Sequence, residues 1–261
     1  MPTSGNDTQH YLEFAQRLAD SARPIALRHF RSPLAVELKS DASPVTIADR
    51  EIEQELRRLI RAEFPSHGIL GEEFGVQPGS GHTWVLDPID GTRSFICGIP
   101  LFGTLIALLD DAAPVLGVID VPALGERWVG AAATPTLCNG TPVRTSGCTR
   151  IEDARICTTT PDSFAPADWD RYEAISRHAA VRRFGGDCYG YCLLASGHCD
   201  LVIEAGLQPY DHLALVRVIE GAGGVITDWQ GKALGLRSDG RVVAAATPLL
   251  WQAALDRLHP A

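Results

Sequence analysis

Two aspartates stand three residues apart in the stretch WVLDPIDGTRSF, directly after an apolar run. Residues 84–86 are typical of the end of a buried strand. We expect Pro88 to end this strand, because proline fixes φ and has no backbone N–H to donate to a neighbouring strand. Asp87 and Asp90 would then lie where a strand becomes a loop, a position from which carboxylates can do chemistry.

The residues that follow these aspartates offer hydrogen-bond donors. Gly91 can adopt backbone angles that other residues avoid, and the side chains of Thr92, Arg93 and Ser94 can donate to an anion. The stretch therefore predicts acidic groups beside an anion site. An aspartate-rich turn without chemical function would give the same local pattern.

Three further acids lie at expected element boundaries, in the stretches SPVTIAD, ILGEEFG and LQPYDHLAL. Asp49 falls in the first turn of an expected helix, where the helix dipole favours an acid. Asp211 stands at the start of another helix, where it could be an N-cap residue. Glu72 could be a solvated loop acid. Each of these structural roles is an alternative to a chemical one.

If these acids converge, their charges need a counterion. Like charges about 4 Å apart repel by roughly 4 kcal/mol per pair at an effective dielectric of 20. All of the candidate ligand atoms are oxygens, which favours Mg²⁺ or Mn²⁺ over zinc or copper. Two such cations can activate a water and stabilise a leaving oxygen, as in phosphoryl transfer. The acids therefore predict a metal-dependent reaction at a phosphate.

The composition excludes several other classes of protein. The 261 residues carry a net charge of −9, and their basic residues form no cluster larger than a pair, so we expect no nucleic-acid partner. No apolar run is long enough to cross a membrane, and the polar N-terminus lacks a secretory signal, which predicts a cytoplasmic protein. Seven cysteines without a CxxC pair indicate neither a disulfide framework nor a zinc ribbon. A metal role for Cys188, Cys192 and Cys199 is an alternative to packing in the core.

Hydrophobic periodicity predicts an N-terminal part and a C-terminal part with different rhythms. The second helix, for example, has its apolar stripe at Ile47, Ile52, Leu56, Leu59 and Ile60. Expected helices cover residues 8–30, 46–64, 168–178, 188–196, 211–220 and 249–258. Expected strands cover residues 69–70, 83–86, 103–109, 114–121, 127–131, 155–158, 181–184, 200–204 and 242–246.

Two layered halves follow from this pattern, divided near residues 145–155. Residues 1–150 form an α+β half with most of the candidate ligands, and residues 151–261 form an α/β half with Asp211 and substrate-binding residues. Turns are expected at Asp110 and Asp111 and at Asn139 and Gly140. The GAGG at residues 221–224 follows a helix and so indicates a helix end rather than a dinucleotide site.

Four blocks of the sequence resemble the inositol monophosphatase superfamily. These blocks are VTIAD from Val45, GEE from Gly71, DPIDGT from Asp87, and PYDHLA with EGAGG from Pro209. The resemblance covers essentially the whole chain. It implies an α+β fold, a layered α/β/α/β/α sandwich, and a lithium-sensitive phosphatase that uses two to three Mg²⁺ ions, with Mn²⁺ as an alternative. It also implies a homodimer that acts on a small phosphorylated substrate.

Residue roles follow from the same resemblance. A first metal would bind Glu72, Asp87 and the carbonyl of Ile89, and a second would bind Asp87, Asp90 and Asp211. Thr92 would orient the attacking water with Asp49 as its hydrogen-bonded partner, and Glu72 would also touch a weakly held third metal. The implied catalytic residues are Glu72, Thr92 and Asp49, and the implied substrate-binding residues are Gly91, Thr92, Ser94, Asp187, Glu204 and Asp211.

Tyr210 stands where members of the superfamily that hydrolyse inositol phosphates usually have tryptophan. Together with the stretch GGDCYGYCLLASG, this difference resembles the histidinol-phosphate phosphatase branch. Asp187 and Glu204 could hold the substrate's ammonium group by charge-assisted hydrogen bonds, although Asp187 could also be a helix cap. The alternatives are a phosphatase for inositol phosphate, fructose bisphosphate or an adenosine phosphate, and a metal-binding regulatory module.

Overall fold

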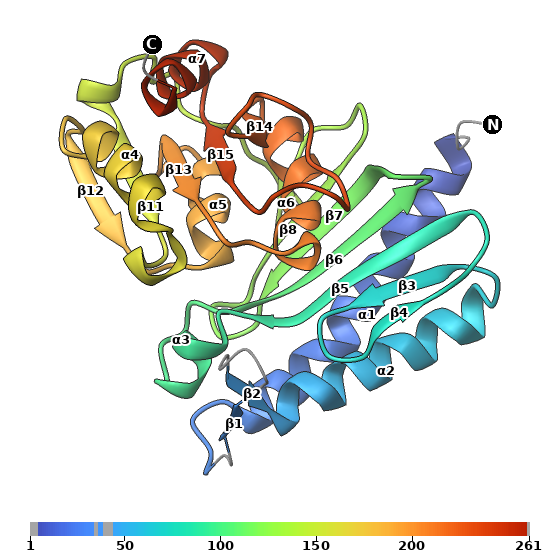
Figure 1. Ribbon diagram of the computed structural model, residues 1–261. Coiled ribbons are helices and arrows are strands. Elements are labelled where there is room, and N and C mark those ends of the chain that lie inside the picture. The colour runs from blue at the N-terminus through green and yellow to red at the C-terminus, as the bar shows by residue number, and fades with distance from the viewer. Residues whose placement is uncertain (1–4, 34–35, 39–43, 260–261) are drawn as a thin grey trace.

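The computed structural model describes residues 5–33, 36–38 and 44–259, which form five alternating layers of helices and sheets (Figure 1). One pair of helices packs on the outer face of a large sheet. A second pair lies between this sheet and a smaller one, and a third pair covers the far side of the smaller sheet. The expected layered α/β/α/β/α sandwich is confirmed.

The larger sheet has eight strands in the order β10-β9-β8-β7-β6-β5-β3-β4, all antiparallel except for the pair β3 and β5. A separate two-stranded ribbon joins β1 (Val36–Leu38) and β2 (Pro44–Thr46). The strands of the larger sheet are β3 (Gly68–Gly71), β4 (Gly75–Gln77), β5 (His82–Asp90), β6 (Gly103–Asp110), β7 (Ala113–Val121), β8 (Glu126–Ala131), β9 (Leu137–Cys138) and β10 (Thr141–Pro142).

The smaller sheet has five strands in the order β12-β11-β13-β15-β14, with β12, β11 and β13 parallel and the other pairs antiparallel. These strands are β11 (Arg155–Thr158), β12 (Val181–Phe184), β13 (Leu201–Glu204), β14 (Val225–Asp228) and β15 (Val242–Ala245). The helices are α1 (Gly5–His29), α2 (Ile47–Glu63), α3 (Thr92–Ile96), α4 (Pro166–Ser176), α5 (Cys188–Ala195), α6 (Pro209–Gly221) and α7 (Pro248–Leu258).

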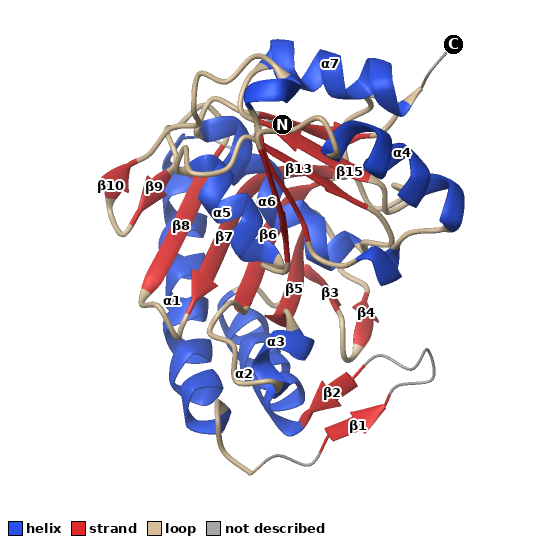
Figure 2. Cartoon of the chain, turned by 90° about the vertical axis from the view of Figure 1, so that its left-hand side faces the viewer, coloured by secondary structure: helices blue, strands red, loops and turns tan. Residues whose placement is uncertain are grey.

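Three hydrophobic cores hold the layers together, and strand β5 contributes to two of them. Trp84 points into the core under α1 and α2, whereas the next residue, Val85, points into the central core around α5 and α6. This alternation is expected for a strand that is buried on both faces. The third core, around Trp229, lies between the smaller sheet and helices α4 and α7 (Figure 2).

Helix α6 lies unusually close to the larger sheet, because two glycines stand beneath it. A Cβ atom added at Gly117 of β7 would lie 1.9 Å from the carbonyl oxygen of Ala214, and one added at Gly130 of β8 would lie 2.4 Å from that of Arg217. Real Cβ contacts are not this short, so only glycine permits this approach of helix and sheet backbones. The first turn of α6, which carries Asp211, is fixed over the sheet as a result.

Most expected elements are present within a few residues, and the turns at residues 110–111, 139–140 and 221–224 are confirmed. The expectation that Pro88 ends its strand is wrong. Strand β5 continues to Asp90, and the strand register shifts between Asp87 and Asp90, which accommodates the missing N–H of the proline. Sequence periodicity also missed the short helix α3 and the strands β1, β2, β4, β9, β10 and β14.

The buried face of α2 differs from the predicted apolar stripe. Ile47 is 60% exposed, whereas Ile52, Leu56 and Ile60 are fully buried. Three charged residues, Asp49, Glu53 and Arg57, are buried beside these apolar side chains. Periodicity missed them because it counts only apolar positions.

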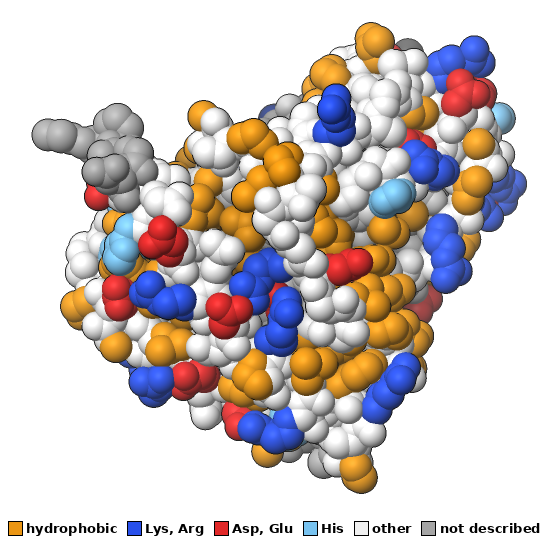
Figure 3. All heavy atoms as spheres, turned by 180° about the vertical axis from the view of Figure 1, so that it is seen from behind, with side chains coloured by type: hydrophobic (Ala, Val, Ile, Leu, Met, Phe, Trp, Pro, Cys, Tyr) orange, Lys and Arg blue, Asp and Glu red, His pale blue; other side chains and the backbone are white. Residues whose placement is uncertain are grey.

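The two sheets come from residues 68–142 and 155–245, and the division into halves 1–150 and 151–261 stays a prediction. Among the described residues, no helix is both long and apolar enough to cross a membrane. The face seen from behind shows acidic and basic side chains scattered between hydrophobic ones (Figure 3).

We expect Gly117→Ala to destabilise the protein, because its methyl group would displace the backbone of α6. Overpacking of this kind costs about 1–3 kcal/mol, and here it meets backbone rather than a flexible side chain. Gly147→Ala is the matched control, since nothing lies within 4 Å of an added Cβ there. Urea unfolding of both variants measures the effect, and an equal stability of the two variants would contradict the close-packing argument.

Candidate active site

Three carboxylates from two segments that are far apart in the sequence meet above the larger sheet. Asp87 and Asp90 come from the end of β5, and Asp211 comes from the first turn of α6. One carboxylate oxygen from each lies within 4.8 Å of the others. The hydroxyl of Thr104 donates to the carbonyl oxygen of Pro88 at 2.8 Å and so fixes the irregular part of β5 between the two aspartates.

Asp211 is not the first residue of its helix. Helix α6 begins at Pro209, two residues earlier than expected, and the Asp211 carboxylate accepts the backbone N–H of Gln208 at 2.7 Å. The capping role and the chemical role are therefore compatible, because the same carboxylate also reaches the acidic cluster.

Asp49 and Glu72 complete the acidic group. Glu72 directly follows β3 and is electrostatically coupled to Asp87. One oxygen of Asp49 accepts both the backbone N–H and the hydroxyl of Thr46, at 2.8 and 2.6 Å. The pKa of Asp49 is raised by burial, and nearby Glu72 raises it further. These two acids therefore belong to one electrostatic environment with the cluster of three.

The hydrogen bond expected between Thr92 and Asp49 is not formed in this structure. The Thr92 hydroxyl instead donates to the carbonyl oxygen of Ile89 at 3.0 Å. Thr92 is the first residue of α3, and Ile89 lies three residues earlier, so this local contact is available as soon as the helix begins. It also engages the carbonyl oxygen that was expected to bind a metal.

Burial and mutual repulsion raise the pKa values of the clustered carboxyl groups. The pKa of Asp87 is raised well above its ordinary value, first by burial and then by the charges of Glu72, Asp90 and Asp211. Burial and the neighbouring Asp187 raise the pKa of Asp90 to about 7, even though its carboxylate accepts the backbone N–H of Cys188 at 2.6 Å. The pKa of Asp211 is raised as well, by burial and by Asp90.

The residues present fit a divalent cation. The Oδ1 atoms of Asp87 and Asp49 are buried and have no hydrogen-bond partner among the described residues. Buried polar atoms are rarely left in this state unless an ion or water completes them. All donors are oxygens, the set that Mg²⁺ and Mn²⁺ prefer. The alternative cysteine site is not supported, because Cys188, Cys192 and Cys199 lie within the central core.

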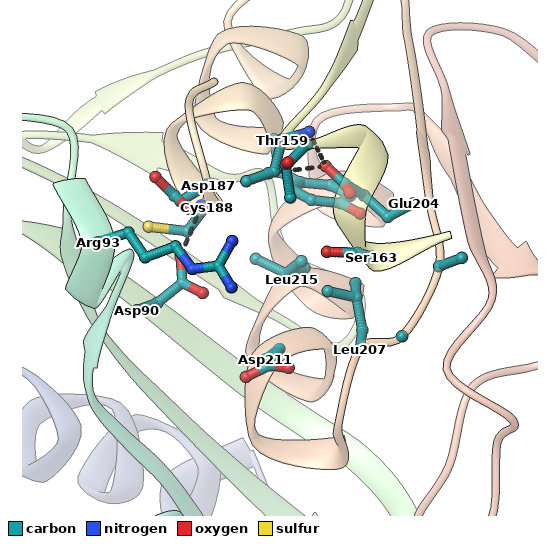
Figure 4. Close-up of a pocket in the computed structure, with 14 residues that line it drawn as sticks. Asp90, Arg93, Thr159, Ser163, Asp187, Cys188, Glu204, Leu207, Asp211 and Leu215 are labelled. Carbon is teal, nitrogen blue, oxygen red and sulfur yellow. Dashed lines mark hydrogen bonds between the residues drawn. The ribbon is translucent and has the colours of Figure 1, made fainter. Parts of the chain in front are cut away.

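A cavity of about 210 Å³ opens beside the acidic cluster (Figure 4). Asp90 and Asp187 lie next to each other on one side of it, Glu204 lies across from them, and Asp211 lies below, so all four acids share one space. Arg93 of α3 contributes a positive charge, and Leu207 and Leu215 contribute apolar surface. The cavity therefore combines a metal-type acidic cluster with a second anionic region.

Asp187 is held by the segment that carries the predicted anion donors. Its carboxylate accepts the Ser94 hydroxyl at 2.7 Å, so Ser94 binds this acid rather than an open anion site. An added Cβ on Gly91 would lie 3.0 Å from the Asp187 carboxyl carbon, which explains the glycine there. Asp187 occupies the N-cap position of α5, as the cap alternative expects, but its side chain makes no capping hydrogen bond. Burial raises its pKa, which the Ser94 bond partly opposes.

Glu204 lies at the end of β13 and is 2% exposed. Its carboxylate accepts the backbone N–H and the hydroxyl of Thr159 at 2.7 and 2.9 Å, and the hydroxyl of Thr158 at 3.2 Å. Burial nevertheless raises the pKa of Glu204 to about 8, and the charge of Asp187 adds to this shift. Glu204 is therefore an acid whose proton a nearby cation could release.

Sequence reasoning missed several residues of this cavity, among them Thr159, Ser163 and Tyr191. The Tyr191 hydroxyl is buried and has no hydrogen-bond partner among the described residues. The run of three threonines at residues 158–160, which begins with the last residue of β11, was the available signal, because polar side chains at the end of a parallel strand often face a ligand.

The model of the inositol monophosphatase family matches residues 7–260. The bifunctional phosphatase IMPL2, chloroplastic, of Arabidopsis thaliana is 44% identical over 99% of this chain and 78% of its own length. A histidinol-phosphatase of Chlorobaculum parvum is 39% identical over 89% of this chain and 91% of its own.

Solved structures agree with these relatives. An inositol monophosphatase from Zymomonas mobilis superposes with a TM-score of 0.90 at 45% identity, covering 98% of this chain and 99% of that one. An inositol monophosphatase from Thermotoga maritima superposes with a TM-score of 0.86 at 25% identity, covering 95% and 96%. The matched family model and the relatives show that this chain belongs to the inositol monophosphatase family.

Proposed function

We propose that this protein is a Mg²⁺-dependent phosphatase that hydrolyses L-histidinol phosphate to L-histidinol and phosphate in histidine biosynthesis. Its family makes it a metal-dependent phosphate monoesterase. The single observation that carries the finer proposal is the second anionic region, Asp187 with Glu204, in the same cavity as the metal-type cluster. Histidinol phosphate carries an ammonium group, and two carboxylates, of which Glu204 is buried and Asp187 half-buried, suit that charge.

In this proposal Glu72, Asp87, Asp90, Asp211 and the carbonyl of Ile89 hold Mg²⁺. When bound, the metal supplies an activated water and stabilises the leaving oxygen. The Thr92 hydroxyl donates its hydrogen bond to the carbonyl oxygen of Ile89, so its lone pairs can accept a hydrogen bond from a water.

Asp49 has a different part in the reaction. Its free Oδ1 lies in the electrostatic field of Glu72 and can take up a water proton, while Thr46 fixes its other oxygen. Arg93 and the α3 segment with Gly91 would face the phosphate. Asp187 and Glu204 would hold the ammonium group, since both acids line the cavity that they share with Arg93, Asp90 and Asp211.

Hydrolysis of inositol monophosphate is the second candidate. The Zymomonas structure, 45% identical, carries the name inositol monophosphatase, and the Arabidopsis relative is named a bifunctional phosphatase. We rank this candidate second because inositol offers only neutral hydroxyls, which can hydrogen-bond to Asp187 and Glu204 but gain no charge pair from them. A homodimer and a cytoplasmic location stay predictions.

Metal removal tests the general activity. We expect no phosphate release after chelation and full recovery with Mg²⁺. Asp87→Asn should remain folded and lose nearly all activity, because Asp87 is the buried member of the cluster and would contribute to both metal sites. Asp228→Asn, a buried acid outside the cluster, serves as the control for fold. Wild-type turnover in metal-free protein would contradict the proposal.

Metal affinity should rise with pH. In the metal-free protein Asp90 keeps its proton up to about pH 7, whereas the unfolded chain loses it near pH 4. Because the pKa of Asp90 is higher in the folded protein than in the unfolded chain, this group stabilises the fold least above about pH 7. Below about pH 7, Mg²⁺ must displace the proton of Asp90 in order to bind. We expect Mg²⁺ to bind about tenfold more tightly at pH 8 than at pH 6 and to release protons. Calorimetry in two buffers of different ionisation enthalpy measures both, and a pH-independent affinity would refute this.

Substrate charge is tested by Asp187→Asn, which preserves the acceptor for Ser94. We expect kcat/KM for histidinol phosphate to fall about tenfold to a hundredfold, the value of a charge-assisted bond of about 1.5–3 kcal/mol. Turnover of glycerol phosphate and inositol phosphate should change much less. Asp162→Asn removes an exposed acid near Arg93 and is the matched control. An equal loss for all esters would make Asp187 structural, and a wild-type preference for inositol phosphate would favour the second candidate.

A further inference from the structure

One face of helix α2 buries three charged side chains in a row. Asp49, Glu53 and Arg57 stand four residues apart, so they lie above one another on the same side of the helix. Glu53 is fully buried and Arg57 is 5% exposed. Buried charges are costly unless hydrogen bonds satisfy them, so this row calls for an explanation.

The two inner members of the row hold the turn that follows β3. The Glu53 carboxylate accepts the backbone N–H groups of Glu73 and Phe74, at 2.7 and 3.2 Å. It also accepts the Arg57 guanidinium at 2.7 Å, and that guanidinium donates to the carbonyl oxygen of Gly75. Side chains of α2 therefore bind the backbone at residues 73, 74 and 75.

Glu53 also packs closely against the residue that precedes Glu72. A Cβ added at Gly71 would lie 2.0 Å from a carboxylate oxygen of Glu53, so the chain can pass here only as glycine. The backbone N–H of Glu72 donates to Leu86 of the neighbouring strand at 3.2 Å. Glu53 therefore packs against Gly71, the residue before Glu72, and accepts hydrogen bonds from Glu73 and Phe74, the two residues after it.

We propose that Glu53, supported by Arg57, is the positioning residue that fixes Glu72 for metal binding. The inference rests on the proposed metal role of Glu72. Because Asp49 lies one helical turn before Glu53, the same face of α2 sets the position of Asp49 relative to Glu72. Outer residues that orient a metal ligand typically change metal affinity about tenfold to a hundredfold when they are altered.

The test compares Glu53→Gln with Glu55→Gln, the same chemical change on the exposed side of α2, where Glu55 pairs with Arg58. A glutamine at 53 can keep at most the two bonds to one of the Glu53 oxygens, and its NH₂ group then faces the N–H that the other oxygen accepted, so the turn loosens. We expect Mg²⁺ to bind about tenfold more weakly to Glu53→Gln by calorimetry. The kcat for glycerol phosphate at saturating Mg²⁺ should stay near wild type, and Glu55→Gln should match wild type in both.

A purely structural role would lower the Tm of the metal-free protein without changing the Mg²⁺ affinity, and that result overturns the proposal. Arg57→Lys is the milder second variant, because it keeps a cation beside Glu53 but cannot also reach Gly75 in the same way. We expect a smaller loss of affinity in the same direction. If Glu53→Gln does not fold, an unchanged affinity in Arg57→Lys overturns the inference. Failure of the wild type to bind Mg²⁺ would instead refute the proposed function.

Discussion

Mutual repulsion among three clustered carboxylates, of which Asp87 is buried and the other two are half-buried, is the constraint on which this structure depends. Asp87, Asp90 and Asp211 place oxygens within 4.8 Å of one another, and burial raises the pKa of each. The three carboxylates would move apart if the backbone segments that carry them were free to move. Rigid elements prevent this: the irregular end of β5 sets the first two acids, and the glycines under α6 set the third. The fold thereby holds the acids so close together that binding of a cation among them is favourable.

The elements of the fold follow from sequence to the extent that their signals are local. Apolar periodicity predicts the long helices and most strands of both sheets, because each repeats its pattern over several residues, but it misses β4, β9, β10 and β14. It fails at α3, which has only five residues, and at Pro88, where a register shift lets the strand continue. Apolar periodicity also could not predict the buried charges of α2, because their carboxylates bind backbone N–H groups, which cannot be identified from the sequence.

The acids of the site were predictable for a different reason. Asp87 and Asp90 lie in one motif, and their roles follow from a resemblance that covers the whole chain. Contacts between distant segments were less accessible. Ser94 and Asp187 are 93 residues apart, and their hydrogen bond turns a predicted anion donor into a support for an anionic side chain. A local pattern can name a donor, but tertiary packing decides which acceptor it meets.

The protonation of Glu204 suggests how one cavity could treat charged and neutral esters differently. With a pKa of about 8, this acid is largely protonated near neutral pH while no cation is present, and three donors from Thr158 and Thr159 surround it. A neutral substrate leaves the proton in place, and the carboxyl group can then donate a hydrogen bond to a hydroxyl. An ammonium group favours the ionised form and expels that proton, so cation binding gains a charge pair at the cost of one ionisation. If histidinol phosphate is the substrate, as we propose, substrate preference in this cavity would follow from the balance between the two protonation states of Glu204, because the phosphate group is common to every ester.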